Sequence, residues 1–368
     1  TTWGAMPYKE RVATRDAAVV RMLEEAGAVL VAKHTLGAIA YGDIWFGGRT
    51  NSPWNTRQGS SGSSAGSAAA TAAGLVGFSI GTETLGSIVS PSMRCGTTGL
   101  RPTFGRVPRT GAMALCWSLD KIGPICRTVE DAALVLAAIN GFDAGDASSI
   151  DVPFAFDANE PVKGTRIGYD PAWFEGRAAH DLDRHALEQL KSLGVEMVEV
   201  KLPERPYDML MTILMVEAAS AFEELTLSNR DDELTWQAPQ AWPNSFRQTR
   251  FTPAIEFLQA MRIRRDVMHI MHDLFEEHRL DLMFGPSYAG PMLLITNNTG
   301  HPCVCLRAGL REFPRRNNDE DDGAAAEPIR VPHGVTLWGR PFDDGKVCRV
   351  AMELERALDV WHVRPPTG

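Results

Sequence analysis

Two glycine- and serine-rich stretches organise this chain: Gly59-Ser-Ser-Gly-Ser-Ser-Ala-Gly-Ser67 and Gly81-Thr-Glu-Thr-Leu-Gly-Ser-Ile-Val-Ser90. Taken alone, runs of Gly and Ser are typical of flexible linkers. Here, however, Ala68-Ala-Ala-Thr-Ala-Ala73 follows the first stretch as a strong helix former, with a serine-rich entry that supplies N-cap oxygens. The apolar residues from Leu75 to Ile80 then predict a short buried strand that ends at Gly81. Loops held between core elements are where catalytic residues are commonly placed.

The composition is that of an ordinary globular protein. The 368 residues are 44% hydrophobic and 23% charged, which is ample for a full core. A net charge of −9 argues against a nucleic-acid or anionic-membrane partner, and no apolar run approaches the length of a membrane span. The six cysteines have no metal-ligand spacing, so we expect reduced core thiols and a cytoplasmic location.

The order of the predicted elements favours an α/β fold. Asp16 is a candidate N-cap of a helix that ends at Gly27, and residues 28–33 predict a buried strand. Thr128 is a candidate cap of a second helix. We further predict strands at 166–169, 195–200, 280–284, 303–306 and 335–338, helices at 182–193, 207–229, 255–279 and 346–360, and an acidic solvated loop at 317–322.

This pattern predicts one α/β/α domain over residues 1–368, with a mixed, twisted sheet covered by helices. Its core would consist of residues 1–150 and 280–368. The long helices would form an insert over about residues 200–279.

Three kinds of site are compatible with the residues. His269 and His272 lie three apart on a predicted helix, with Glu276 four further on, but an exposed polar helix face explains them better than a metal site does. A Gly/Ser loop before a helix could bind phosphate, although neither standard glycine-rich phosphate motif is present. The third possibility is a serine nucleophile at Ser87, assisted by a serine of the first loop.

Several motifs, in their order along the chain, resemble the amidase signature family. The resemblance covers nearly the whole chain, and it implies hydrolysis of amide-type C–N bonds on an α/β/α fold without metal or cofactor. The motifs are Gly62-Ser-Ser-Ala-Gly-Ser-Ala68, Gly81-Thr-Glu-Thr-Leu-Gly-Ser-Ile88, Cys95-Gly-Thr-Thr-Gly-Leu-Arg-Pro-Thr-Phe-Gly-Arg106, Ser118-Leu-Asp120, Gly123-Pro124, Arg127-Thr-Val-Glu-Asp131, Asn298-Thr-Gly300 and Gly339-Arg-Pro-Phe342.

The resemblance also implies roles for individual residues. Ser87 matches the family's nucleophile. Ser63 matches the bridging serine, which family members hold after a cis peptide bond, here Gly62–Ser63. The backbone N–H groups of Thr84, Leu85, Gly86 and Ser87 match the oxyanion hole, in which one donor is typically worth about 3–4 kcal/mol of barrier.

The third catalytic residue of the family is a lysine base, and its matching position would precede Thr1. We therefore expect the segment that carries this lysine to be absent from the sequence. Lys33 matches a different family lysine, so we expect its ammonium to lie beyond hydrogen-bond reach of Ser63.

Three residues depart from the family pattern, and these departures bear on which substrate the protein accepts. Family members often have Asp at Glu83, Gly at Leu85 and Arg at Val89. A charged substrate group that enters an apolar cleft loses hydration without a partner. We therefore expect neutral apolar or aryl amides and carbamates as substrates. The expected pocket residues are Leu85, Val89, Met113, Leu115, Trp117 and Ile122.

Two other readings stay open beside the amidase. One is the glutaminase component of a tRNA-dependent amidotransferase, which shares these motifs and works with partner chains. The other is a non-catalytic relative that serves as a scaffold. For the amidase we expect a small-molecule substrate and no cofactor, with a homodimer left open.

Overall fold

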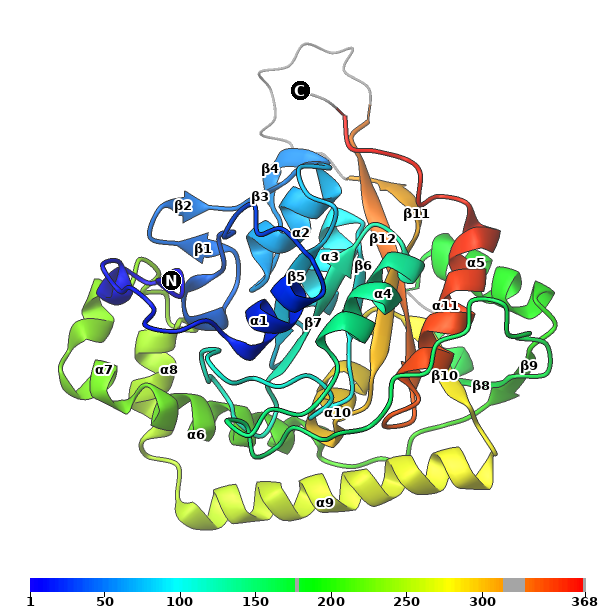
Figure 1. Ribbon diagram of the computed structural model, residues 1–368. Helices are drawn as coiled ribbons and strands as arrows, with labels where there is room; N and C mark the ends of the chain where they lie inside the picture. The colour runs from blue at the N-terminus through cyan, green and yellow to red at the C-terminus, as the bar shows by residue number, and fades with distance from the viewer. Residues whose placement is uncertain (176–178, 314–327, 367–368) are drawn as a thin grey trace.

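Within residues 1–175, 179–313 and 328–366, which the computed structural model describes, the chain forms a mixed sheet of eight strands between layers of helices (Figure 1). The strands are β5 (Ser79–Glu83), β6 (Thr98–Arg101), β7 (Lys121–Cys126), β8 (Arg166–Tyr169), β9 (Glu196–Glu199), β10 (Leu282–Pro286), β11 (Cys303–Glu312) and β12 (Arg330–Gly339). Their order is β5-β7-β6-β11-β12-β10-β8-β9. In this order, each strand from β5 through β12 is antiparallel to the next one. The last three strands, β10, β8 and β9, run parallel to one another.

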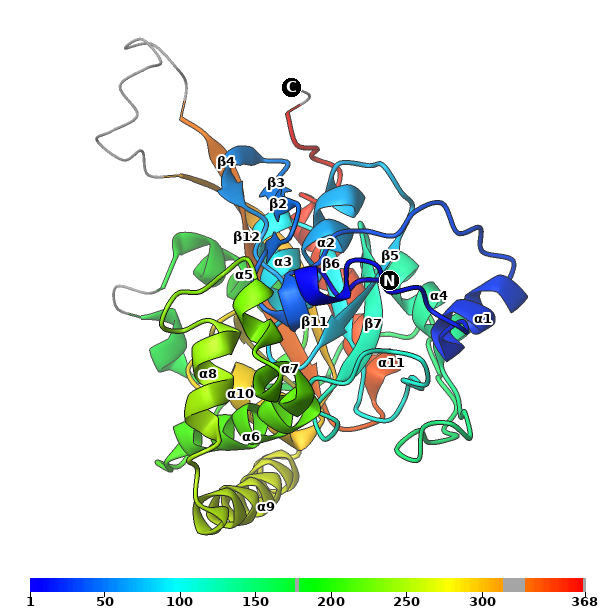
Figure 2. The same ribbon diagram turned by 90° about the vertical axis from the view of Figure 1, so that its left-hand side faces the viewer.

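Helices cover both faces of this sheet, and Figure 2 shows α1 and α4 on one side and α6 to α9 on the other. The first face carries α4 (Val129–Ile139), α5 (Asp181–Ser192) and α11 (Asp344–Leu358), with α1 (Ala18–Glu25) packed on α4. The second face carries α2 (Ala65–Ala72), α3 (Val89–Cys95), α10 (Met292–Thr299) and α9 (Ala254–Glu277). The remaining helices are α6 (Met211–Ala221), α7 (Glu223–Leu227) and α8 (Trp242–Thr249), with 3-10 turns at Met6–Tyr8, Ala38–Ala40, Pro171–Phe174, Tyr207–Leu210 and Arg230–Glu233. Two short strand pairs lie outside the main sheet: β1 (Ile44–Trp45) with β2 (Gly48–Arg49), and β3 (Asn51–Ser52) with β4 (Asn55–Gly59).

The strands alternate their side chains between two hydrophobic cores, as the pleat of a sheet requires. On β10, Leu282 and Phe284 enter the first core, beneath α4, α5 and α11. Met283 enters the second core, beneath α3, α9 and α10. A third core joins the N-terminal residues to α6 and α8. The expected mixed α/β fold is therefore confirmed.

The strand expected at residues 28–33 is wrong. This segment has no regular structure, and Val29, Leu30 and Val31 are 81%, 62% and 70% exposed. A strand has to bond a neighbouring strand, and among the described residues this segment bonds none: β5, at the edge of the sheet, pairs only with β7. Apolar character alone therefore did not determine the structure here.

The segment between the two glycine-rich loops also differs from its prediction. Residues 75–78 form a turn with Leu75 exposed, and the strand begins only at Ser79 and continues to Glu83. Ser64 stands at the N-cap of α2 without capping it. Its hydroxyl instead donates to Thr82 O and accepts from Thr82 N, which fastens the helix start to β5.

The predictions for helix starts and lengths were correct in part. Thr128 caps α4 by accepting from Asp131 N, as expected. The single helix expected at 207–229 is broken into a 3-10 turn, α6 and α7, because Phe222 adopts non-helical backbone angles. Asp16 does not cap α1, which starts after Ala17.

Among the described residues, no helix combines the length and apolar character that crossing a membrane requires. The six cysteines, all of which are described, are free and buried, in line with their expected role as core thiols. The acidic run expected at 317–322 lies outside the described residues.

Candidate active site

The first glycine-rich loop connects β4 to α2 and places Ser63 in the interior, where it is 2% exposed. The Gly62–Ser63 peptide bond is cis, as expected. Gly62 has to be glycine, because a Cβ there would lie 1.9 Å from Gly42 O. Asp43 holds the loop by accepting from Ser61 N at 3.0 Å, and Gly37 N donates to Ser63 O at 3.1 Å.

The second loop, Thr84 to Ser87, connects β5 to α3 and lies directly beside the first. Ser64 N donates to Ser87 O at 3.2 Å, and Ser87 is 7% exposed. Gly86 has φ +84°, a conformation that glycine adopts without strain. Among the described residues, the N–H groups of Thr84, Leu85, Gly86 and Ser87 have no hydrogen-bond acceptor. Buried N–H groups are normally bonded, so four unbonded donors in succession mark this loop as a candidate binding site.

A buried carboxylate, Glu83, fixes the end of this loop. Its oxygens accept from Ile88 N and Val89 N at 2.8 and 2.9 Å, at the start of α3. They also accept from Arg101 Nη1 and Asn297 Nδ2, each at 2.9 Å. Burial raises the pKa of Glu83, but the charge of Arg101 and these hydrogen bonds outweigh it and lower the pKa overall. Glu83 is therefore ionised and ties β5, α3 and α10 together around Ser87.

Lys121 is a second buried charge in this region, which sequence reasoning missed. It lies opposite Glu83 in the β5–β7 pairing, and its Nζ donates to Leu119 O and Asn297 O. Burial, followed by the charge of Arg101, lowers the pKa of Lys121 to about 7. The only sequence signal was a lysine that begins the otherwise uncharged strand Lys121–Cys126.

His301 is buried beside the same arginine and makes folding pH-dependent. Burial, followed by the charge of Arg101, lowers the pKa of His301 to about 3, against about 6.5 in an unfolded chain. The unfolded state therefore binds a proton below pH 6.5 that the native state does not, and stability is lost as the pH falls toward 3.

We expect the unfolding free energy of the wild type to fall by about 1.4 kcal/mol per pH unit more than that of His301→Gln below pH 6. Urea unfolding of both proteins between pH 7.5 and 5 measures this difference. Parallel pH profiles would contradict the assignment.

A pocket of about 270 Å³ lies beside Thr84, at the start of the second loop, and its lining does not include Ser63 or Ser87. Of the expected pocket residues, four line it: Met113, Leu115, Trp117 and Ile122. Leu85 packs against the third core instead, and Val89 lies in the second core, where it is 1% exposed. Val89 was expected to border the cleft, but its side chain packs in the core instead. Its N–H is bound to Glu83, and its side chain faces the sheet.

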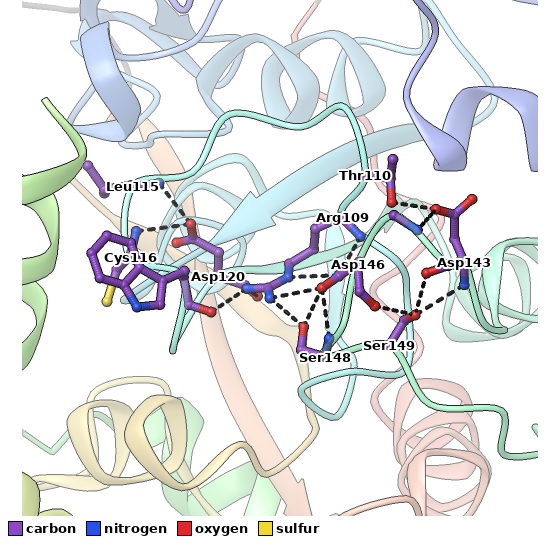
Figure 3. A network of polar contacts seen from close by, with 11 residues as sticks. Arg109, Thr110, Leu115, Cys116, Asp120, Asp143, Asp146, Ser148 and Ser149 are labelled. Carbon is purple, nitrogen blue, oxygen red and sulfur yellow. Dashed lines mark hydrogen bonds and ion pairs between the residues drawn. The ribbon is translucent and has the colours of Figure 1, made fainter.

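Polar contacts hold the wall of this pocket, as Figure 3 shows. Asp120 accepts from Thr84 Oγ1 at 2.6 Å and from Leu115 N and Cys116 N at 2.8 and 3.0 Å. It therefore connects the pocket wall to the first residue of the second loop. Nearby, Arg109 forms an ion pair with Asp146 at 3.1 Å. Burial raises the pKa of Asp146, but hydrogen bonds from Arg109 and Ser148 lower it overall.

The remaining candidate groups do not join this site. Lys33 Nζ donates to Thr1 Oγ1 at 3.0 Å on the surface. His269, His272 and Glu276 are exposed on α9, and Glu276 pairs with Arg340. Among the described residues, no cluster of three His, Cys, Asp or Glu side chains could hold a metal ion.

Two serines in adjoining buried loops, beside a row of free N–H donors, define a candidate serine hydrolase site. A sequence model of the amidase family matches residues 1–348. A glutamyl-tRNA(Gln) amidotransferase subunit from Halalkalibacterium halodurans is 33% identical, over 96% of this chain and 79% of that protein. The chain belongs to the amidase signature family. It is accordingly an enzyme that acts on carbon–nitrogen bonds.

Solved structures agree with this assignment. The corresponding glutamyl-tRNA(Gln) amidotransferase subunit of Thermotoga maritima aligns with a TM-score of 0.77 and 27% identity, over 97% of this chain and 79% of its own. The native peptide amidase of Stenotrophomonas maltophilia aligns with a TM-score of 0.80 and 26% identity, over 100% of this chain and 81% of its own.

Proposed function

We propose that the protein hydrolyses carboxamides through an acyl-enzyme on Ser87. The observation that carries this proposal is the row of unbonded N–H groups from Thr84 to Ser87, which ends at a buried serine. Preorganised donors of this kind stabilise the oxyanion that forms when a nucleophile adds to a carbonyl group.

In the proposed reaction, Ser87 Oγ adds to the amide carbon while its proton passes to Ser63. The tetrahedral oxyanion accepts hydrogen bonds from the Thr84–Ser87 loop. The C–N bond then breaks, the nitrogen leaves with a proton returned through Ser63, and water hydrolyses the ester on Ser87. The final proton acceptor in this proposal is the family's lysine, whose matching position precedes Thr1 in the numbering.

The proposed substrates are neutral amides or carbamates with an apolar or aryl group. Met113, Trp117 and Ile122 give the pocket an apolar wall. Two of the charged groups in its lining, Arg109 and Asp146, neutralise each other. Arg15 also lines the pocket but is exposed to water. Asp120 and Lys121 line the pocket as well, but Asp120 already accepts from Thr84 and Lys121 already donates to backbone oxygens. A charged substrate group would therefore lose hydration here without gaining a free buried partner.

The test is a comparison of kcat/KM for an aryl amide, an aryl carbamate and glutamine on the full-length enzyme. We expect the neutral aryl substrates to exceed glutamine by at least about tenfold, because a desolvated charge costs more than about 1.4 kcal/mol. Glutamine turnover equal to or above that of the aryl substrates would contradict the proposed specificity.

A second candidate function is that of a glutamyl-tRNA(Gln) amidotransferase component. The similarity to proteins of that name, at 33% identity over 96% of this chain, favours it. Ammonia release from glutamine that depends on added partner chains and ATP would establish this function in place of the first.

The hydrogen bond from Thr84 to Asp120 leads to a further prediction about the rate of the proposed reaction. Thr84→Val and Asp120→Ala should each lower kcat by roughly tenfold, because the first donor of the proposed oxyanion loop loses its anchor. Since both changes remove one shared bond, the double variant should be little slower than the slower single variant. Thr84→Ser keeps the hydroxyl and should restore the rate. Additive losses in kcat would contradict the anchoring role.

A further inference from the structure

Tyr288 occupies an unusual position on the connection between β10 and α10. The residue is 53% exposed, yet its hydroxyl donates to Ser90 Oγ at 3.0 Å. Burial of the hydroxyl raises the pKa of Tyr288. The side chain is thus held at its tip while much of its surface remains open to solvent.

The partner of this hydroxyl lies close to the proposed oxyanion loop. Ser90 N donates to Gly86 O at 2.7 Å. A Cβ built on Gly86 would meet Ser90 Oγ at 3.0 Å and Leu293 Cδ2 at 3.2 Å. Tyr288, through Ser90, and Leu293 therefore converge on the residue that precedes Ser87.

The connection that carries Tyr288 is firmly seated. Thr336 Oγ1 donates to Ser287 Oγ at 3.3 Å, which fastens the residue before Tyr288 to β12. Gly290 lies against Trp173, whose Nε1 would be 3.0 Å from a Cβ at that position. Ala289 N donates to Pro286 O at 3.0 Å. A rigid aromatic side chain loses little conformational entropy when it contacts a ligand.

We propose that Tyr288 and Leu293 form a second wall, in addition to the Met113–Trp117 pocket, that contacts the apolar or aryl group of the substrate. This proposal rests on the proposed function and deepens it by placing a specificity determinant beside Gly86. An aromatic ring contacts an aryl group favourably in offset or edge-to-face geometry. The exposed tyrosine ring would supply such a surface near the proposed reacting carbonyl, and the bond to Ser90 fixes its orientation.

The experiment compares acetamide, benzamide and acetanilide, so that the aryl group is absent, on the acyl side or on the amine side. Tyr288→Ala should lower kcat/KM for at least one aryl amide by about tenfold, mainly through KM, and leave acetamide within twofold. Tyr288→Phe keeps the ring and should stay within about threefold of the wild type. Phe251→Ala, which removes an exposed aromatic side chain between α8 and α9, is the matched control and should change none of the three.

Equal losses for all three amides, no loss for either aryl amide, or a loss in Tyr288→Phe as large as in Tyr288→Ala would each overturn the proposal. A binding measurement separates this result from failure of the proposed function. In the Ser87→Ala background, calorimetric Kd values for benzamide and acetanilide should rise about tenfold on Tyr288→Ala for the aryl amide that shows the selective loss. Absence of wild-type turnover would contradict the proposed hydrolysis. Unchanged Kd values for both aryl amides would contradict the proposed contact of Tyr288 with the aryl group.

Discussion

Ser87→Ala should lower kcat for any amide that the wild type hydrolyses by at least about a thousandfold, because the acyl-enzyme of the proposed reaction forms on the Ser87 hydroxyl. The melting temperature should change by only a few degrees, since the proposed role of the Ser87 hydroxyl is catalytic rather than structural. Steady-state kinetics and thermal unfolding of the purified variant measure the two effects.

Ser192→Ala is a suitable control for this variant. Its hydroxyl donates to Gln189 O on the exposed end of α5, so the rate should be unchanged. If Ser87→Ala retains more than a hundredth of wild-type activity, Ser87 is not the nucleophile.

Glu83→Gln should have the largest effect on stability. The exchange leaves Arg101, fully buried like Glu83 itself, without a countercharge, and it weakens the bonds to Ile88 N and Val89 N. Breaking a buried ion pair on one side typically costs about 3–5 kcal/mol, and we expect a loss of that size in the unfolding free energy. Urea unfolding at pH 7.5 is the measurement.

Glu196→Gln provides the comparison for this variant. Glu196 pairs with Arg166 in a largely exposed position, so its loss should cost less than about 1 kcal/mol. A similarly small loss for Glu83→Gln would show that the buried network does not support the Ser87 loop.

The sequence predicted the cis peptide bond before Ser63 correctly, but it predicted several of the surrounding strands and caps poorly. The positions of Ser63 and Ser87 followed from motifs, and the structure places their loops side by side through Ser64 N and Ser87 O. The sequence could not show that residues 28–33 form no strand, because an apolar run does not reveal whether a neighbouring strand bonds it.

The residues that surround the two loops also could not be predicted from the sequence. Val89 lies two residues from Ser87 yet faces the second core, since α3 starts at Val89 and turns that side chain toward the sheet. Lys121 and Tyr288 reach the site from positions distant in the chain, through the β5–β7 pairing and the β10–α10 connection. Such contacts depend on the packing of whole elements, which local patterns do not encode.

Labelling with a serine-directed fluorophosphonate, followed by peptide mass spectrometry, tests the central claim most directly. Attack by Ser87 on the phosphorus would expel fluoride and leave a stable phosphonyl ester in the oxyanion site. On the folded full-length protein we predict one adduct, on Ser87, which disappears in Ser87→Ala. Absence of any adduct, or an adduct that persists at another residue in Ser87→Ala, would contradict the assignment of Ser87 as the nucleophile.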